Sequence, residues 1–388
     1  CTLYLGEHDP RLALRPPLDL WRRLLKAPQP FSLGTLPFPP STGCIGRARE
    51  LLILERLLEN QPTVFLRGPG GIGKTTVAIA LARWLARCGH YHRIAYIRND
   101  DASDPRSLLD ALGRQLLPTG KHWSVEQYPS WWQALDNVRQ TLRPQPILIV
   151  LDQLERWHSE QDEAFDSFWK ALMHEWSELH LLGLGRAGPP PFTPYWTEVT
   201  LGPLEETDAI LLISRVLATT GEAPPSTDNG SGFPQLHSIV TLAGSHPGAL
   251  LRVAHEISVR GVNAAQELLY SFRTGLHQHG NDPKWPLYLS LELVLRQLSP
   301  ADRERLTILA FFRDGANRIA LAHALALDTP AVTTFSERLI TLGLAEDQGY
   351  GHLRFDPALI HYLDNQLDLA LRPVWRARWR AGMEHLLA

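Results

Sequence analysis

One short stretch of this chain has the residues and spacing of a phosphate-binding loop. It reads Gly68-Pro69-Gly70-Gly71-Ile72-Gly73-Lys74-Thr75 and fits the pattern G-x-x-x-x-G-K-[ST]. Glycines let the backbone turn tightly, so that consecutive N–H groups point at one anionic oxygen. Lys74 adds a positive charge for the β- and γ-phosphates, and the Thr75 hydroxyl is suited to bind Mg²⁺. We therefore expect ATP or GTP to bind with Mg²⁺, held by Gly68, Gly70, Gly71, Ile72, Gly73, Lys74, Thr75 and Thr76.

A second element of the expected site is the apolar run 146–152, which ends in the carboxylate of Asp152. Such a run is typical of a strand buried on both faces of a parallel sheet. A carboxylate at the end of a strand beside the loop would hold the Mg²⁺ shell, so we assign Asp152 a metal-binding and catalytic role alongside Thr75. The alternative is a helix cap or turn residue.

Hydrolysis is less clearly indicated than binding. Gln153 stands where many ATPases carry a second carboxylate that activates the attacking water. Glu155, two residues further along, is the remaining candidate for that catalytic role. The sequence therefore predicts nucleotide binding and leaves open whether the chain is a slow ATPase.

Alternating strands and helices are expected to position these residues. Helices are predicted at 46–58, 76–86, 105–117, 130–142 and 162–179. Strands are predicted at 63–67, 93–98, 146–152, 181–184 and 198–201. This alternation predicts a doubly wound α/β domain with a parallel sheet over residues 41–203.

Beyond residue 203 helical periodicity dominates. Helices are predicted at 205–219, 236–258, 264–276 and 372–387, with a flexible loop at 220–232. Residues 286–370 are predicted to form a compact helical unit ending in a small hairpin, the shape of a winged helix. The expected domains are a Pro-rich linker at 1–40 with a short helix near 18–25, the nucleotide domain at 41–203, a helical domain at 204–285, the winged helix at 286–370 and a further helical region from 371.

Composition narrows the class of protein. The chain has 388 residues, 44% of them hydrophobic and 20% charged, as in an ordinary globular protein. A net charge of −3 gives no electrostatic case for a nucleic-acid or membrane partner. Three scattered cysteines suit a reducing cytoplasm, and no apolar run approaches the ~20 residues that span a bilayer. We expect a cytoplasmic protein.

Four motifs in order resemble the STAND ATPases, the signal-transduction class that includes NB-ARC and NACHT proteins. Residues 44–50 match h-h-G-R-x-x-E, and residues 150–155 are similar to the Asp-Gln-hydrophobic-Glu form of the Mg²⁺ strand. Arg186 follows a strand as the sensor arginine of that class does, and residues 244–250 stand where the family has Gly-Leu-Pro-Leu-Ala-Leu. The resemblance implies nucleotide, helical and winged-helix domains folded round a buried nucleotide, usually ADP at rest.

The resemblance also implies roles for individual residues. Ile45, Gly46 and Arg47 would contact the adenine and its neighbourhood, Arg186 would sense the γ-phosphate, and Pro247 would close over the base or ribose. A helix start, a solvated loop arginine and a helix-start proline are the respective alternatives.

Two departures from the family pattern are visible. The usual Thr-Ser is missing before Arg186. Residues 354–356 read Arg-Phe-Asp where many NB-ARC proteins have Met-His-Asp. The histidine that reads the β-phosphate in those proteins is therefore absent by sequence.

The expected function is a two-state switch of a signalling or defence receptor. ADP would hold the domains closed, and exchange to ATP would open them and lead to self-association. Residues 2–10 look like the end of a caspase-like CHAT domain, and the chain begins at Cys1 rather than Met. We therefore expect an excised core that joins an N-terminal effector domain to a C-terminal sensor domain of a bacterial receptor.

The main alternative function is that of a winged-helix AAA-type ATPase or transcriptional regulator that acts on DNA. Residues 286–370 contain seven Arg and no Lys against eleven acidic residues. The expected recognition helix at 331–342 offers only Arg338, offset by Glu337. Because DNA-binding helices need several cationic side chains, this composition disfavours a function on DNA.

Overall fold

A computed structural model describes residues 31–98, 104–117, 123–142, 145–154, 162–176, 178–186, 188–189, 196–219, 232–275, 285–312, 315–367 and 370–387. The expected helix near 18–25, the CHAT-like segment 2–10, most of the loop 220–232 and Glu155 lie outside these residues. The chain divides into two compact units, Cys1–Leu212 and Ile213–Ala388.

The first unit is built on a sheet of five parallel strands in the order β2-β3-β4-β1-β5. The strands are β1 (Thr63–Arg67), β2 (Arg93–Arg98), β3 (Ile147–Asp152), β4 (Leu179–Gly185) and β5 (Thr197–Thr200). Every residue of β3 is buried, as its continuous apolar run predicts. The predicted parallel α/β fold is thus confirmed. The central strand β4 pairs with both β1 and β3.

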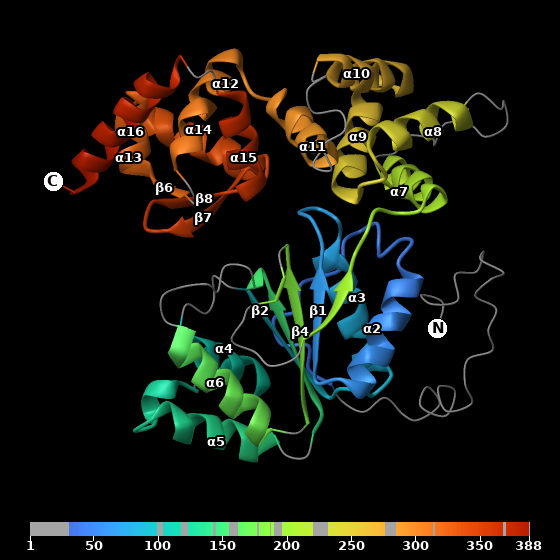
Figure 1. Cartoon of the computed structure of the whole chain (residues 1–388), viewed down its shortest axis with the longest axis vertical. Helices are drawn as coiled ribbons and strands as arrows, with labels where there is room; N and C mark the ends of the chain where they lie inside the picture. The colour runs from blue at the N-terminus through green and yellow to red at the C-terminus, as the bar shows by residue number, and fades with distance from the viewer. Residues whose placement is uncertain are drawn as a thin grey trace. The chain divides into compact units, whose positions relative to one another are not determined.

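Helices cover both faces of this sheet (Figure 1). One layer contains α2 (Ala48–Asn60) and α3 (Lys74–Arg87); the other contains α4 (Pro105–Leu116), α5 (Trp131–Leu142), α6 (Asp162–Glu175) and the 3₁₀ turn η4 (Val125–Gln127). Side chains alternate between the layers: Val64 and Leu66 of β1 join the core under α2 and α3, whereas Phe65 joins the other core. The sheet is therefore buried from both sides.

The second unit begins within a helix. α7 (Glu206–Thr219) crosses the division between the units, and α8 (Gly232–Leu242), α9 (Pro247–Arg260), α10 (Val262–Gly275) and α11 (Trp285–Leu295) follow. The single helix predicted at 236–258 is wrong, because the chain breaks between α8 and α9. Gly244 and Ser245 have φ of +66° and +52°, which no α-helix accommodates, and Pro247 starts the next helix.

The remainder of this unit combines helices with a small antiparallel sheet of order β6-β8-β7. Its elements are α12 (Pro300–Leu306), the 3₁₀ turn η7 (Thr307–Phe311), β6 (Gly315–Asn317), α13 (Arg318–Leu325), α14 (Thr329–Thr341), β7 (Ala345–Gly349), β8 (His352–Phe355), α15 (Pro357–Gln366) and α16 (Arg372–Leu387). The predicted hairpin is present as β7 and β8. Strand β6 was not predicted, since three residues give too short a pattern.

Helix α16 packs closely into the second unit. Trp375 is buried in its core, and Trp379 packs partly against it. Gly382 permits close approach to α13, because a Cβ there would lie 2.5 Å from the carbonyl oxygen of Ala320. The two tryptophans are thus core residues. Among all the helices described, not one has the length and apolar character needed to cross a membrane.

Candidate functional site

The candidate site lies at the carboxyl end of β1, where the loop 68–73 leads into α3. Gly71 and Gly73 have φ of +73° and +101°, a region that only glycine enters without strain. Ile72 between them is 1% exposed, so its side chain anchors the loop in the core. The Gly68 N–H donates to the carbonyl oxygen of Gly185 at 3.1 Å, which ties the loop to the end of β4.

The loop ends at a helix N-terminus that no side chain caps. Gly73 is the N-cap of α3, and no side-chain cap hydrogen bond is present there. A Cβ placed on Gly73 would meet nothing within 4 Å, so the backbone borders open space. Uncapped N–H groups and the positive end of the helix dipole suit an anion. These residues therefore fit a bound phosphate group.

Lys74 extends across this loop. Its Nζ donates to the carbonyl oxygens of Gly68 at 2.7 Å and Pro69 at 3.0 Å. The ammonium group is therefore already held over the loop whose amides would bind the phosphates.

Thr75 and Asp152 come together although 77 residues separate them. The Thr75 hydroxyl donates to Asp152 Oδ2 at 2.8 Å. The other carboxylate oxygen, Oδ1, accepts from the Gln153 N–H at 2.9 Å. Gln153 has φ of +64°, an uncommon conformation for a non-glycine residue that is often found at functional sites. A hydroxyl and a carboxylate in contact are the oxygen ligands that Mg²⁺ prefers, so both residues fit the predicted metal site.

Tyr96 is a site residue that sequence reasoning missed. It is 5% exposed, and its hydroxyl donates to Asp152 Oδ2 at 2.7 Å. Tyr96 on β2 pairs with Val150 on β3, two residues before Asp152. The side chains of Tyr96 and Asp152 therefore point to the face of the sheet that α3 covers. The only available signal was a tyrosine within the otherwise apolar stretch 94–97. Such a hydroxyl usually finds a polar partner when buried.

Arg186 lies against the loop. It follows β4, and a Cβ placed on Gly70 would be only 3.3 Å from its Cζ. The central position of β4, between β1 and β3, places Arg186 at the sheet edge shared by the loop and Asp152. A side chain at Gly70 would require the Arg186 guanidinium to shift by a few tenths of an ångström.

Ile45 and Arg47 are buried beside the loop, and Gly46 between them is half-buried. Ile45 is 8% exposed and Arg47 4% exposed. The guanidinium of Arg47 donates to Ile72 O at 3.2 Å, Gly202 O at 2.7 Å and Pro203 O at 3.4 Å, and forms an ion pair with Glu50 at 2.9 Å. Its donors thus face backbone carbonyls, and the contact of residues 45–47 with adenine stays a prediction.

Cys44 precedes this segment. Burial raises the pKa of its thiol to about 11, an effect that the nearby Arg47 charge opposes and the Glu50 charge reinforces. The thiol is therefore protonated at neutral pH and is a poor nucleophile there.

The described structure says less about three other predicted site residues, Thr76, Glu155 and Pro247. Thr76 lies in the first turn of α3, and Glu155 is outside the described residues. Pro247 is the first residue of α9, where His246 provides the N-cap by accepting from the Ala249 N–H. Pro247 therefore has a sufficient structural role as a helix start, and its contact with the nucleotide stays a prediction.

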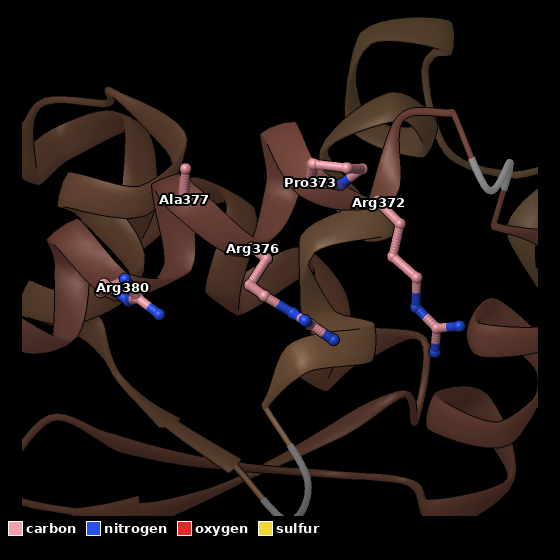
Figure 2. Close-up of a pocket in the computed structure, with 5 residues that line it drawn as sticks. All are labelled: Arg372, Pro373, Arg376, Ala377 and Arg380. Carbon is pink, nitrogen blue, oxygen red and sulfur yellow. The ribbon is translucent and has the colours of Figure 1, made fainter.

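A different positively charged feature occurs on α16. A hollow of about 330 Å³ is lined by Arg372, Pro373, Ala377 and two further arginines, Arg376 and Arg380 (Figure 2). The three arginines repeat every fourth residue and so follow one side of the helix. The hollow includes no residue of the phosphate loop.

Comparison with known proteins gives a family for part of the chain. Residues 49–175 match the NB-ARC domain. This range contains the phosphate loop, Tyr96 and Asp152. No curated protein sequence matches the chain.

Solved structures also match. A Walker-type ATPase of Pyrococcus abyssi is 16% identical, with 85% of this chain and 99% of that one covered and a TM-score of 0.44. A STAND protein with a tetratricopeptide repeat sensor from Pyrococcus horikoshii is 15% identical, with 91% of this chain but 46% of that one covered and a TM-score of 0.45. The Aeropyrum pernix ORC1 protein, in complex with DNA, is 16% identical, with 89% and 96% covered and a TM-score of 0.41. Likenesses at this level carry no inference about function.

Proposed function

We propose that this chain, whose residues 49–175 match the NB-ARC domain, is a P-loop ATPase of the STAND class that acts as a molecular switch controlled by ATP and ADP. The observation that carries the proposal is the contact between Thr75 and Asp152 beside an uncapped, glycine-rich helix start. A hydroxyl, a carboxylate and an ammonium group are gathered there around backbone suited to phosphate.

Four side chains have separate roles in this proposal. Lys74 neutralises phosphate charge, and Thr75 with Asp152 holds Mg²⁺. Arg186, which lies against Gly70, interacts with the terminal phosphate. Bound Mg²⁺ would screen the charge of the β- and γ-phosphates. Ile45, Gly46 and Pro247 are assigned to the adenosine by resemblance alone.

Slow turnover is part of the proposal. Gln153 follows Asp152 in place of a second carboxylate, and an amide is a poor base for activating water. We expect the isolated chain to hydrolyse ATP at well below ~1 s⁻¹, the low end of ordinary enzymes.

Switching would involve the rest of the chain. We assign residues 204–285 to a helical domain and 286–370 to a winged-helix domain; the antiparallel sheet β6-β8-β7 with α13 and α14 supports the latter. ADP would favour a closed state, whereas exchange to ATP would favour opening and self-association. A cytoplasmic receptor with an N-terminal effector and a C-terminal sensor is the proposed context.

The free energy of nucleotide binding is too small to drive the proposed switch by itself. A nucleotide at a thousand times its Kd stabilises its preferred state by about 4 kcal/mol. Moving a population from 1:99 to 99:1 takes about 5.5 kcal/mol. Sensor binding or assembly must therefore contribute the difference.

The proposal is tested on the purified chain in two steps. Mass spectrometry of the small molecules released on denaturation identifies any co-purified nucleotide. Calorimetric titration with ADP and ATP, each with and without Mg²⁺, then measures affinity. Chain that releases no nucleotide and binds neither one would refute the proposal. Light scattering with each nucleotide tests self-association separately.

A further inference from the structure

We propose that Arg47 is a positioning residue that couples the phosphate loop to the linker 201–205, and so reports nucleotide binding to the start of α7. This inference rests on the proposed function, since it concerns how occupancy of the same site is transmitted. It gives Arg47 a role in addition to the predicted contact with the adenine.

The guanidinium of Arg47 bridges two segments that are far apart in sequence. One nitrogen, NH2, donates both to Ile72 O in the loop at 3.2 Å and to Gly202 O in the linker at 2.7 Å. The second, NH1, donates to Pro203 O at 3.4 Å and pairs with Glu50 Oε1 at 2.9 Å. Movement of either segment therefore alters the hydrogen bonds of the other.

Burial makes this bridge costly to disturb. Arg47 is 4% exposed, so its charge has lost nearly all contact with water. A buried charge is tolerated only when it is paired and hydrogen-bonded. The Glu50 carboxylate and three backbone carbonyls provide that compensation here. If the loop carbonyl turned away, the guanidinium would be left partly unsatisfied.

The loop end of the bridge is the part that phosphate would affect. The Ile72 carbonyl lies between Gly71 and Gly73, the two positions with positive φ. The side chain of Ile72 is held in the core while the glycines on each side leave the backbone free to adjust. Phosphate bound to the loop amides would select one orientation of these peptide groups and, with them, of the carbonyl that Arg47 binds.

The linker end connects to the rest of the chain. Leu201 N donates to Arg67 O at 2.8 Å, which secures the start of the linker to β1. The linker then enters α7, the helix that passes from the first unit to the second. Gly46, next to Arg47, also touches the first turn of α7: a Cβ on Gly46 would lie 2.5 Å from Asp208 Cβ. Residues 46 and 47 thus contact both the linker and the helix that it starts.

The experiment compares hydrogen exchange of the amides at 201–210 in three proteins, with and without saturating nucleotide and Mg²⁺. The variant Arg47→Met keeps the apolar stem and removes the bridge. The matched control is Arg49→Met, which removes an exposed arginine two residues away on α2. Calorimetry on each protein confirms that the nucleotide is bound during exchange.

We expect nucleotide to slow exchange at 201–210 by roughly tenfold in the natural chain and in Arg49→Met, the scale of a typical coupling between sites. In Arg47→Met with nucleotide bound, the slowing should fall below about twofold. If the natural chain binds no nucleotide, the proposed function itself is refuted. A natural chain that binds nucleotide without slowing exchange at 201–210 would overturn the coupling alone.

Retention of the full slowing in Arg47→Met would also overturn the coupling, because the linker would then sense nucleotide by another route. If Arg47→Met does not fold or bind, Arg47→Lys replaces it; lysine keeps the charge but has one nitrogen, so an intermediate slowing is expected. Should both variants bind no nucleotide, Arg47 acts on the pocket directly and the coupling role is wrong.

Discussion

The phosphate loop of the first unit and the arginine-lined hollow on α16 both offer positive groups to an anion, but they are built differently. The loop has one lysine and many backbone N–H groups, and β1, α3, β3 and β4 all contribute to its surroundings. The residues described around the hollow, with three arginines among them, all come from a single helix.

This contrast indicates that specific anion binding depends more on how firmly the charged groups are held than on how many there are. Lys74 is held by two carbonyls, and the Asp152 carboxylate accepts from Thr75, Tyr96 and Gln153. In the hollow, Arg372 forms an ion pair with Asp364 at 2.5 Å, and both side chains are more than a third exposed. Exposed pairs of this kind contribute little, because water and salt screen them. We therefore expect a specific site at the loop and weak, general attraction at the hollow.

The largest effect is expected from Lys74→Ala. Loss of a charged donor to the phosphates should weaken ATP binding by about 1.5–3 kcal/mol, roughly ten- to hundredfold. Calorimetric titration measures this change, and Arg376→Ala is the matched control that removes a cation from α16. Equal losses in the two variants would contradict the distinction between the sites.

The next largest effect is expected from Asp152→Asn. An amide retains the shape but lacks the charge that holds Mg²⁺, so the gain in ATP affinity on adding Mg²⁺ should fall by roughly tenfold. The comparison is made by titrating ATP in Mg²⁺ and in EDTA. Affinity in EDTA should change little; an unchanged response to Mg²⁺ would exclude Asp152 as a ligand.

A smaller effect is expected from Tyr96→Phe. The ring still fills its buried position, but Asp152 Oδ2 loses a hydrogen bond worth about 0.5–1.5 kcal/mol. Unfolding in urea should show this loss, and the response of ATP binding to Mg²⁺ should weaken less than in Asp152→Asn. A larger effect than in that variant would mean that Tyr96 contacts the ligand itself.

The smallest effect is expected from removing Arg376 and Arg380 together by substitution with Ala. Surface substitutions of this kind change stability by about 0.5 kcal/mol or less, and ATP affinity should stay the same. Thermal unfolding and the same titrations measure both. A marked fall in ATP affinity would show that α16 takes part in nucleotide binding after all.

Several elements were predictable because their signals are local. β2 matches its predicted range of 93–98, and α16 matches 372–387. The boundary between α6 and β4 was predicted less accurately. The predicted helix at 162–179 ends at Glu175, and β4 begins at Leu179 rather than at 181. Pairing of β4 with both β1 and β3 extends it beyond its apolar core, and no local pattern encodes that pairing.

From its residues alone, the chain's phosphate loop could be recognised, because eight consecutive residues carry both the conformational freedom and the charge. The partners of that loop could not. Tyr96 meets Asp152 across 56 positions, and Arg47 meets Gly202 across 155. Such contacts depend on strand order and on which helix covers which face. Tertiary packing therefore decided that a tyrosine supports the carboxylate and that an arginine from the first motif links the loop to residues 202 and 203.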